Sequence, residues 1–443
     1  MGMSKRSGAV GAPGLGARRK RTVSAEVSDL IYDWNKVYAA SMKPAGRVLL
    51  NDESLRDGLQ SPSVHDPTIE EKIEILHLMD DLGINFLDIG LPGAGPRAIA
   101  HCEALANEIG RARLKVKPNC AARTHENDIR PIAEIAQRTG IPIEAATFIG
   151  SSPIRRYTED WTDDFLLRTT EKAVRFAVSQ GLEVMYVTED TTRCDPQTIR
   201  RLYSNAINCG AHAIVICDTA GHATPMGTVA LMHYVVNEVV KPSGQNIRVE
   251  WHGHCDRGLA VANSIAALVA GAEVVHATAC GIGERVGNTQ MDQMLVNLKL
   301  MDIEPWASRD LSKLKQYCEA VANATGIPIP PNYPVVGDDA FRTATGVHAA
   351  AVIKAYRKND EMLANSIYSG VPSHYFGMKQ IIEIGPLSGK SNVHFWLERH
   401  GIPATPELVE RIFQRAKNSA KSLTDGEILE CCRAAGVAVS LAS

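Results

Sequence analysis

The sequence predicts a parallel (β/α)8 barrel followed by a mainly helical C-terminal region, and three observations support this prediction. From Arg47 onward, short apolar runs alternate with amphipathic segments of helical length. The alternation repeats eight times over about 250 residues, the usual length of such a barrel. The runs are continuously apolar, as expected of parallel strands that are buried on both faces. After about residue 303 the alternation stops.

The elements of the barrel are expected in strict alternation. The strands are expected at 47–51, 84–90, 114–119, 143–149, 182–187, 213–218, 247–252 and 273–279. The helices are expected at 68–82, 96–109, 125–138, 163–179, 196–208, 225–240, 258–270 and 289–301, with a short amphipathic helix at 28–40 before the first strand. An open doubly wound sheet is the competing fold. It would more often have a GxGxxG turn after its first strand, whereas residues 52–58 here read DESLRDG.

Three regions are expected along the chain. Residues 1–26 are basic and rich in glycine, which predicts a disordered tail; an organelle transit peptide is the alternative, but the run lacks an amphipathic pattern. Residues 27–303 form the barrel domain. Residues 304–443 form helical subdomains for linkage and dimerisation, with helices expected at 308–325, 338–358, 361–367, 389–400, 405–420 and 424–435 around a Pro-rich stretch at 327–334.

Composition is typical of a globular enzyme. The chain has 443 residues, of which 45% are hydrophobic and 22% charged, with a net charge of −3. This balance gives no electrostatic reason to expect nucleic acid or a membrane as a partner, and no apolar run reaches the roughly 18 residues that span a bilayer. The ten cysteines are scattered without CxxC spacing, which predicts reduced thiols and a cytoplasmic location.

A candidate metal site lies at the end of the seventh expected strand. His252 and His254 point to the same side of that strand because side chains alternate with a period of two. Two unrelated histidines are the alternative, so a third ligand is needed. Asp57 follows strand one, which closes the barrel beside strand eight and near strand seven, and Asn288 can add a neutral oxygen. Such a site leaves open positions for a bidentate small molecule, for example a 2-oxo acid.

Polar residues follow all eight expected strands, where a barrel carries its chemistry. Helix capping explains single cases such as Asp190 and Asp218, but not eight. Arg56 is the candidate to hold a developing alkoxide beside the metal, and a structural ion pair with Asp88 is its alternative role. The full set of candidates after the strands comprises Arg56, Asp57, Gln60, Asp88, Arg123, Ser151, Ser152, Glu189, Asp190, Asp218, Thr219, His252, His254 and residues 281–288.

Three segments together resemble the motifs of the metal-dependent 2-isopropylmalate and homocitrate synthases. They are 55–62 (LRDGLQSP), 252–254 (HGH) and 281–288 (GIGERVGN), and the resemblance spans about residues 45–420. It implies that Asp57, His252 and His254 bind Mg²⁺, Mn²⁺ or Zn²⁺, with Asn288 completing or neighbouring the shell. It also implies an acyltransferase that condenses acetyl-CoA with a 2-oxo acid, giving a 2-hydroxy-2-substituted dicarboxylate and CoA.

Further matches extend this resemblance. Residues 188–190 (TED) are similar to an acidic motif whose Glu, here Glu189, lies near the acetyl-CoA methyl group. In 218–221 (DTAG) the resemblance assigns Thr219 to the substrate carboxylate. Residues 345–348 (TGVH) resemble a motif whose histidine, here His348, is a base candidate that reaches in from the partner of a homodimer, assisted by a tyrosine at the place of Tyr368. A solvent-facing histidine and a packing tyrosine are the alternatives.

Two alternative functions remain. Lyases that cleave 3-hydroxy-3-methylglutaryl-CoA share the first motif, but they are shorter and carry a different loop after strand eight. A barrel that has lost its chemistry and only binds is the second alternative, and the complete set of Arg56, Asp57, His252, His254, Glu189 and His348 opposes it. The length of the chain predicts no leucine-regulatory domain and no leucine inhibition.

The expected substrate is an aliphatic 2-oxo acid, as in 2-isopropylmalate or citramalate synthesis. Met185 and Val187 stand where homocitrate synthases carry an arginine and a serine for a second carboxylate, and an apolar pocket cannot offset the desolvation of that group. Gln60 and Arg56 are the remaining substrate-binding candidates. Homocitrate or citrate synthesis stays open for two reasons. Arg97, Arg155 and Arg156 on the catalytic face can supply a carboxylate clamp, and Cys255 and Asp88 depart from the family pattern.

Overall fold

The computed structural model describes residues 27–37, 43–44 and 46–437. The chain divides into two compact units, Met1–Val37 and Tyr38–Ser443. In the first unit, η1 (Val27–Leu30) and η2 (Trp34–Lys36) replace the single helix expected at 28–40. The side chain of Asp33 accepts a hydrogen bond from the Asn35 amide (3.0 Å), which begins a new turn instead of continuing the first. The tail expected at 1–26 lies outside the described residues.

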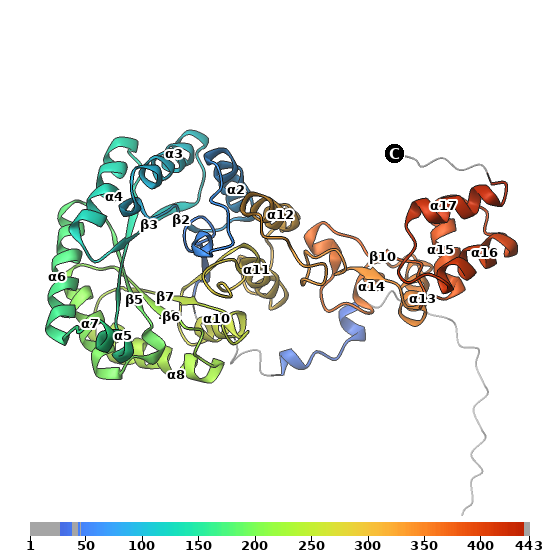
Figure 1. Cartoon of the computed structure of the whole chain (residues 1–443). Helices are drawn as coiled ribbons and strands as arrows, with labels where there is room; N and C mark the ends of the chain where they lie inside the picture. The colour runs from blue at the N-terminus through green and yellow to red at the C-terminus, as the bar shows by residue number, and fades with distance from the viewer. Residues whose placement is uncertain (1–26, 38–42, 45, 438–443) are drawn as a thin grey trace, which may run out of the picture. The chain divides into compact units, whose positions relative to one another are not determined.

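Eight parallel strands close into a barrel in the order of the sequence, which confirms the predicted fold class (Figure 1). Strand β1 pairs with β8 in the register Leu50↔Val275, which closes the sheet. The strands are β1 (Leu49–Asp52), β2 (Phe86–Asp88), β3 (Lys117–Arg123), β4 (Glu144–Gly150), β5 (Val184–Glu189), β6 (Ala213–Asp218), β7 (Arg248–Gly253) and β8 (Val274–Ala277).

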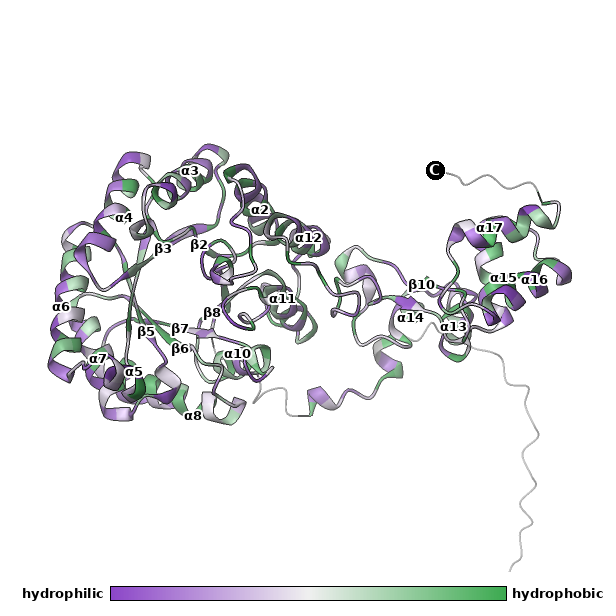
Figure 2. Ribbon diagram, in the orientation of Figure 1, coloured by the Kyte–Doolittle hydropathy of each residue, from purple (hydrophilic) through white to green (hydrophobic). Residues whose placement is uncertain are grey.

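Helices follow every strand, and their ends agree with the capping residues of the sequence. Thr68 caps α2 through a capping box with Glu71, and Gly83 ends this helix in the left-handed conformation. The barrel helices are α2 (Ile69–Leu82), α3 (Pro96–Ala112), α4 (Glu126–Thr139), α6 (Asp163–Ser179), α7 (Pro196–Cys209), α8 (Pro225–Val235), α10 (Ala260–Val269) and α11 (Met291–Leu300). In Figure 2 these helices carry both hydrophilic and hydrophobic residues along their length, as amphipathic helices do.

A few short elements were not predicted. The helix expected at 225–240 changes into a π-helical turn, η6 (Val236–Val240), and the short helix α9 (Lys241–Ser243). Helix α5 (Pro153–Thr158) begins at a proline and is too short to show a helical period. Short helical turns also follow β1, β2, β5 and β8: η3 (Asp57–Gln60), η4 (Pro92–Ala94), η5 (Thr191–Arg193) and η7 (Ala279–Gly281).

The barrel's apolar core extends beyond residue 303. Trp306 is fully buried and donates a hydrogen bond from Nε1 to the Val48 carbonyl oxygen (3.0 Å). Helix α12 (Leu314–Thr325) contributes Leu314, Tyr317 and Val321 to the same apolar cluster. The packing of the barrel therefore includes α12, which the sequence-based boundary at 303 left outside.

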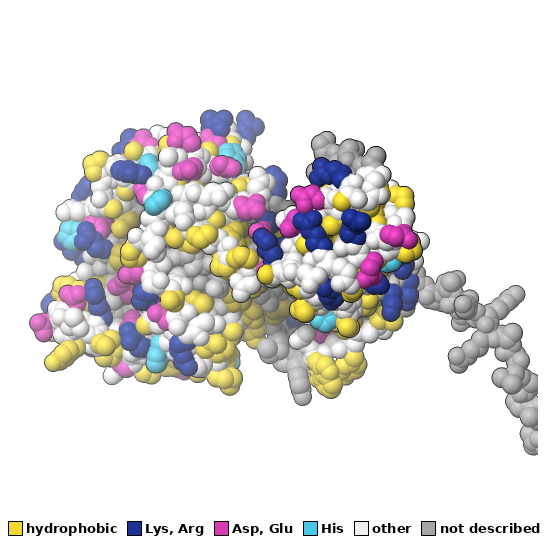
Figure 3. All heavy atoms as spheres, turned by 45° about the vertical axis from the view of Figure 1, so that its right-hand side comes forward, with side chains coloured by type: hydrophobic (Ala, Val, Ile, Leu, Met, Phe, Trp, Pro, Cys, Tyr) yellow, Lys and Arg dark blue, Asp and Glu magenta, His cyan; other side chains and the backbone are white. Residues whose placement is uncertain are grey.

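The remaining C-terminal part is mainly helical, as predicted. A two-stranded parallel sheet that was not predicted, β9 (Arg342–Thr343) with β10 (Ile381–Ile382), lies among its helices. The helices are α13 (Gly346–Tyr356), α14 (Glu361–Ser366), η8 (Ser373–Phe376), α15 (Lys390–Arg399), α16 (Pro406–Lys417) and α17 (Asp425–Ala434). On the face drawn in Figure 3, basic and acidic side chains are interspersed. No helix among the described residues is long and apolar enough to cross a membrane.

Candidate active site

The candidate site is a cavity of about 130 Å³ at the carboxyl ends of the barrel strands. One side is polar and is formed by residues from β1, β5, β6, β7, β8 and the segments that follow them. Its predicted members are Arg56, Asp57, Gln60, Glu189, Thr219, His252 and His254. The structure thus brings together residues that are almost 200 positions apart in the sequence, from Arg56 to His254.

Three of the four predicted metal ligands, Asp57, His252 and His254, converge within this cavity, and Asn288 lies beside His254. Asp57 begins η3, His252 lies on β7, and His254 follows that strand in a bridge with Asn288. Asp57 Oδ2 lies 3.6 Å from Nε2 of each histidine, and the two Nε2 atoms lie 3.3 Å apart. Three donor atoms at these mutual distances surround a point that a divalent cation can share.

Orphaned oxygens support this assignment. Asp57 Oδ2 and Asn288 Oδ1 are buried and have no hydrogen-bond partner. The side-chain nitrogen Nδ2 of Asn288 donates a hydrogen bond to the Ile282 carbonyl oxygen (3.2 Å). This leaves the side-chain oxygen Oδ1 available as an acceptor or a metal ligand. Buried polar atoms are rarely left unsatisfied, so these atoms fit a site for Mg²⁺, Mn²⁺ or Zn²⁺.

The protonation states of the three residues suit a metal. Burial lowers the pKa of His252 to about 3, although the carboxylates of Asp57 and Glu53 oppose the shift. Burial also lowers the pKa of His254. Burial alone would raise the pKa of Asp57, but the combined attraction of Arg56, His252 and His254 outweighs burial and the pKa is lowered. At neutral pH the site therefore holds two neutral imidazoles and one carboxylate, the forms that bind metals.

Arg56 is held in place by three carboxylates. Its Nε lies 2.7 Å from Asp88 Oδ2 and its Nη1 lies 3.2 Å from Asp57 Oδ1, while Nη2 contacts Glu53. The ion pair with Asp88, considered as the alternative role, is thus present. It does not withdraw the side chain from the site, because Arg56 still lines the cavity. Asp88 therefore fixes the guanidinium of Arg56 at the wall of the cavity.

Sequence reasoning missed a row of charged residues that runs from the site into the barrel. His276 on β8 lies between two carboxylates, with Nδ1 2.7 Å from Glu53 Oε1 and Nε2 2.6 Å from Glu250 Oε2. Arg248 continues the row, with Nε 2.6 Å from Glu250 Oε1 and Nη2 2.7 Å from Glu144 Oε1. We call these five residues the charged row. Burial would lower the pKa of His276, but its hydrogen bonds to Glu250 and Glu53 outweigh it and raise the pKa to about 9.

The sequence held a pattern that predicts the charged row. On β7, Arg248, Glu250 and His252 occupy alternate positions, and alternate residues of a barrel strand point to the interior. A charged residue at two successive inward positions requires partners of opposite charge on neighbouring strands. Glu53 and His276 also line the cavity, so the row forms part of its floor.

The opposite side of the cavity is apolar. It includes the predicted Met185 and Val187, together with Ala121, Ala146, Phe148, Val215 and Cys217. Among the described residues that line the cavity, Arg56 is the only arginine or lysine. The three arginines considered as a carboxylate clamp are paired elsewhere: Arg97 with Asp66 (2.9 Å), Arg155 with Glu159 (3.1 Å) and Arg156 with Asp163.

Glu189 and Thr219 are further predicted residues that line the cavity. Burial raises the pKa of Glu189, a shift that Arg155 opposes and Glu284 increases. Thr219 accepts a hydrogen bond at Oγ1 from the Asp190 amide (2.9 Å), so its hydroxyl proton remains available to a ligand.

His348 and Tyr368 lie together but do not line the cavity. Their rings stack with centroids 4.1 Å apart and planes inclined by 30°. His348 is exposed near the start of α13, and Tyr368 is 52% exposed. The structure therefore pairs these two residues with each other and not with the rest of the predicted site.

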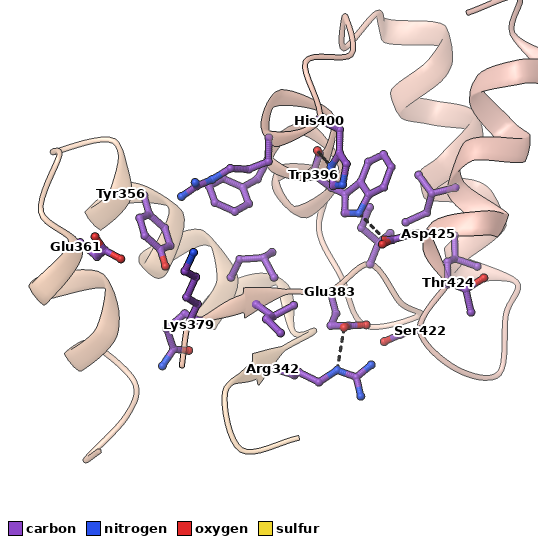
Figure 4. Close-up of a pocket in the computed structure, with 18 of the residues that line it drawn as sticks. Arg342, Tyr356, Glu361, Lys379, Glu383, Trp396, His400, Ser422, Thr424 and Asp425 are labelled. Carbon is purple, nitrogen blue, oxygen red and sulfur yellow. Dashed lines mark hydrogen bonds and ion pairs between the residues drawn. The ribbon is translucent and has the colours of Figure 1, made fainter. Parts of the chain in front are cut away.

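A larger cavity of about 1080 Å³ lies in the C-terminal part (Figure 4). Its walls come from β10, α13, α15 and the segment before α17. Polar groups in it are engaged with each other, as in the pairs Arg342–Glu383 (2.8 Å) and Trp396–Asp425 (3.0 Å). None of its residues belongs to the groups of metal-ligating side chains found in the described part of the chain. The barrel cavity is therefore the candidate active site.

Comparison with known proteins agrees with the architecture. A family model described as HMGL-like matches residues 47–321. The homocitrate synthase AksA of Methanopyrus kandleri is 32% identical over 391 residues, covering 87% of this chain and 92% of that protein. A 2-isopropylmalate synthase of Pyrococcus abyssi is 32% identical over 388 residues, covering 86% and 76%. The crystal structure of the hydroxymethylglutaryl-CoA lyase of Pseudomonas aeruginosa matches with a TM-score of 0.53 at 19% identity, over 64% of this chain and 94% of that chain, which reflects the shared fold.

Proposed function

Since the chain belongs to the HMGL-like family, we propose that it is an acyltransferase that condenses acetyl-CoA with a small aliphatic 2-oxo acid. The products are a 2-hydroxy-2-substituted dicarboxylate and CoA. The observation that carries this proposal is the convergence of Asp57, His252, His254 and Arg56 on one cavity whose opposite wall is apolar. The synthase names of the relatives over most of the chain agree with it.

The metal site supports the activation of the 2-oxo acid. A divalent cation held by Asp57, His252, His254 and Asn288 would supply Lewis acidity to the keto group and a charge for the adjacent carboxylate. Which of Mg²⁺, Mn²⁺ or Zn²⁺ serves is left to measurement. Thr219 can donate its hydroxyl proton to the same carboxylate.

The reaction itself needs a base, a carbon–carbon bond and a hydrolysis. A base removes a proton from the acetyl methyl group, and the resulting carbanion attacks the keto carbon of the 2-oxo acid. The keto oxygen becomes an alkoxide, and Arg56 lies in the cavity to hold its charge. The alkoxide takes up a proton, and water cleaves the thioester to release CoA. Glu189 lies in the same cavity, where it can accept a hydrogen bond from the acetyl group in its enol form.

The apolar wall determines the proposed substrate class. Met185, Val187 and Val215 offer no partner for a second carboxylate, and burying an unpaired carboxylate is costly. The side chain of an aliphatic 2-oxo acid, such as pyruvate or 2-oxoisovalerate, fits this surface. Homocitrate-type synthesis from 2-oxoglutarate would need a cation there. Arg97, Arg155 and Arg156 form ion pairs with carboxylates of the protein, which disfavours homocitrate-type synthesis.

The base is proposed to come from a second copy of the chain. His348 and Tyr368 are stacked, exposed and absent from the cavity wall of their own chain, which fits a role in the active site of a homodimer partner.

In the described structure all ten cysteines are free, and this supports a reducing compartment such as the cytoplasm.

The test is the release of CoA thiol from acetyl-CoA with Mg²⁺ or Mn²⁺ and a panel of 2-oxo acids from pyruvate and 2-oxoisovalerate to oxaloacetate and 2-oxoglutarate. We expect release with an aliphatic acid and at least tenfold lower kcat/KM with 2-oxoglutarate. No release with any acid, combined with acetoacetate formation from 3-hydroxy-3-methylglutaryl-CoA, would replace the synthase by a lyase.

A further inference from the structure

A second group of metal-ligating side chains lies outside the catalytic cavity. Cys280 belongs to η7 after β8, Asp292 lies in the first turn of α11, and Cys318 lies on α12. The two sulfur atoms and one carboxylate oxygen all lie within 4.8 Å of one another. None of the three residues lines the catalytic cavity. We call this group the Cys–Asp–Cys cluster.

Asp292 is a buried carboxyl group without a cationic partner in the described structure. Its side chain is fully buried and forms no ion pair there with an arginine, lysine or histidine. It accepts hydrogen bonds from the Cys280 amide (2.7 Å), Gln293 Nε2 (2.8 Å) and Tyr333 Oη (3.4 Å). The carboxyl groups of the charged row, by contrast, each have a basic neighbour. A buried carboxylate is costly unless it is paired or coordinates a metal.

The two thiols complete a donor set that selects the type of cation. Cys318 is fully buried and Cys280 is half-buried, and both are free thiols. Sulfur ligands disfavour Mg²⁺ and Ca²⁺ and favour Zn²⁺, which accepts two thiolates and a carboxylate in a tetrahedral site.

We infer that the Cys–Asp–Cys cluster is a structural Zn²⁺ site with Cys280, Cys318 and Asp292 as ligands and water in the fourth position. Binding replaces the protons of the two thiols, which pass to solvent. No electrons are transferred, so no oxidant or reductant is needed. The site is independent of the proposed catalytic metal.

A cation in the Cys–Asp–Cys cluster would hold the loop after β8 in place. Cys280 adopts a left-handed backbone conformation with φ 52°, which a residue other than glycine rarely adopts without support. The same loop continues to Asn288, which joins the catalytic cavity through its bridge with His254. A cation shared by η7, α11 and α12 would fix the start of this loop to two helices.

The test uses the full-length protein and two metals. Zinc content per chain is measured after dialysis. Absorption is then recorded after replacement with Co²⁺, because thiolate ligands give Co²⁺ a near-ultraviolet charge-transfer band that oxygen and imidazole ligands do not. We expect the wild type to show this band. Cys318→Ser should lose the band and one metal equivalent per chain, and Asp57→Ala should lose one equivalent but keep the band.

Two further variants control the result. Cys280→Ser changes the less buried thiol and should also abolish the band, which covers the case that Cys318→Ser does not fold. Cys209→Ser removes a buried thiol on α7, outside the cluster, and should leave the metal content and the band unchanged. A wild type without the band, or a Cys280–Cys318 disulfide found by peptide mass mapping, would overturn the inference. Neither result would affect the catalytic metal, which Asp57→Ala tests separately.

Discussion

At the scale of single residues, the site is defined by how charge is distributed over a few buried groups. Asp57 joins two parts of the site, because it lies beside Arg56 and beside both His252 and His254. The histidines stay neutral through burial, and the aspartate stays ionised through Arg56. Each residue therefore keeps the form that its role needs without any change of pH near neutrality.

Arg56→Lys tests the role of the guanidinium. Lysine keeps the charge but cannot contact Asp88, Asp57 and Glu53 together, so the cation would no longer be held toward the cavity. We expect kcat to fall on the order of 100-fold, the usual cost of losing one donor to a developing oxyanion, with metal content unchanged. Arg138→Lys, on an exposed pair with Glu103, is the control and should keep full activity. A kcat within a few-fold of wild type for Arg56→Lys would rule out this role.

Glu189→Gln tests the pH dependence of the reaction. Burial raises the pKa of Glu189, and its ionised form accepts a stronger, charge-assisted hydrogen bond from the enol form of the acetyl group than its protonated form does. Activity should therefore fall as pH decreases through this raised pKa, so the acidic limb of kcat/KM lies above the ordinary range of a glutamate. In Glu189→Gln the limb should disappear and the remaining activity should be low. An unchanged acidic limb in this variant would assign the limb to another group.

At the scale of elements, the loop after β8 depends on glycines that no other residue can replace. Gly287 has φ +88°, and a Cβ added there would lie 1.7 Å from the Gly281 carbonyl oxygen. Gly283 has φ +145°, and a Cβ there would lie 2.2 Å from Asn288 Nδ2. The glycines of the motif at 281–288 thus allow the chain to fold back on itself and present Asn288 beside His254.

Gly287→Ala should displace this loop. Since a shift of about 1 Å in a catalytic group can cost on the order of 100-fold in rate, we expect a loss of that order in kcat/KM together with weaker metal binding. Gly244→Ala is the control: Gly244 has φ +65° with no atom within 4 Å of the added Cβ, so it bears only the backbone strain of about 1–2 kcal/mol. Equal activity of the two variants would show that the loop tolerates the clash.

The elements were predictable because the apolar periods are long and clear. All eight strands and the barrel helices were predicted from the sequence, with ends that shift by a few residues. The short elements were not, because α5, β9 and β10 contain too few residues to show a period. The convergence of Asp57, His252 and His254 was predictable because each lies at or just after the end of a strand whose place in a barrel is fixed. The pairing of Arg56 with three carboxylates was not, because side-chain contacts across strands depend on register and rotamers.

At the scale of the whole molecule, the charged row is the main departure from an ordinary barrel interior. Barrels of this type are usually filled with layers of branched aliphatic side chains. Here Glu53, His276, Glu250, Arg248 and Glu144 link β1, β8, β7 and β4 across the interior. The row begins at the floor of the catalytic cavity, so it couples barrel stability to the position of Glu53, which contacts Arg56.

His276→Gln should destabilise the barrel strongly. It removes the imidazolium between two buried carboxylates, and the loss of one partner of a buried ion pair costs about 3–5 kcal/mol. Glu250→Gln in the same chain should recover part of this loss, because it removes one of the two carboxylates that faced the imidazolium. The urea midpoints of the wild type, the two single variants and the double variant measure this coupling. Additive effects would mean that the two side chains do not interact.

The central claim is that a divalent metal at Asp57, His252 and His254 binds an aliphatic 2-oxo acid against the apolar wall. The most direct test is calorimetric titration of 2-oxoisovalerate into the protein with Mn²⁺, into the metal-free protein, and into Asp57→Ala with Mn²⁺. We expect binding in the first case only, and at least tenfold weaker binding of 2-oxoglutarate. Equal binding of 2-oxoisovalerate without metal, or by Asp57→Ala, would contradict the account.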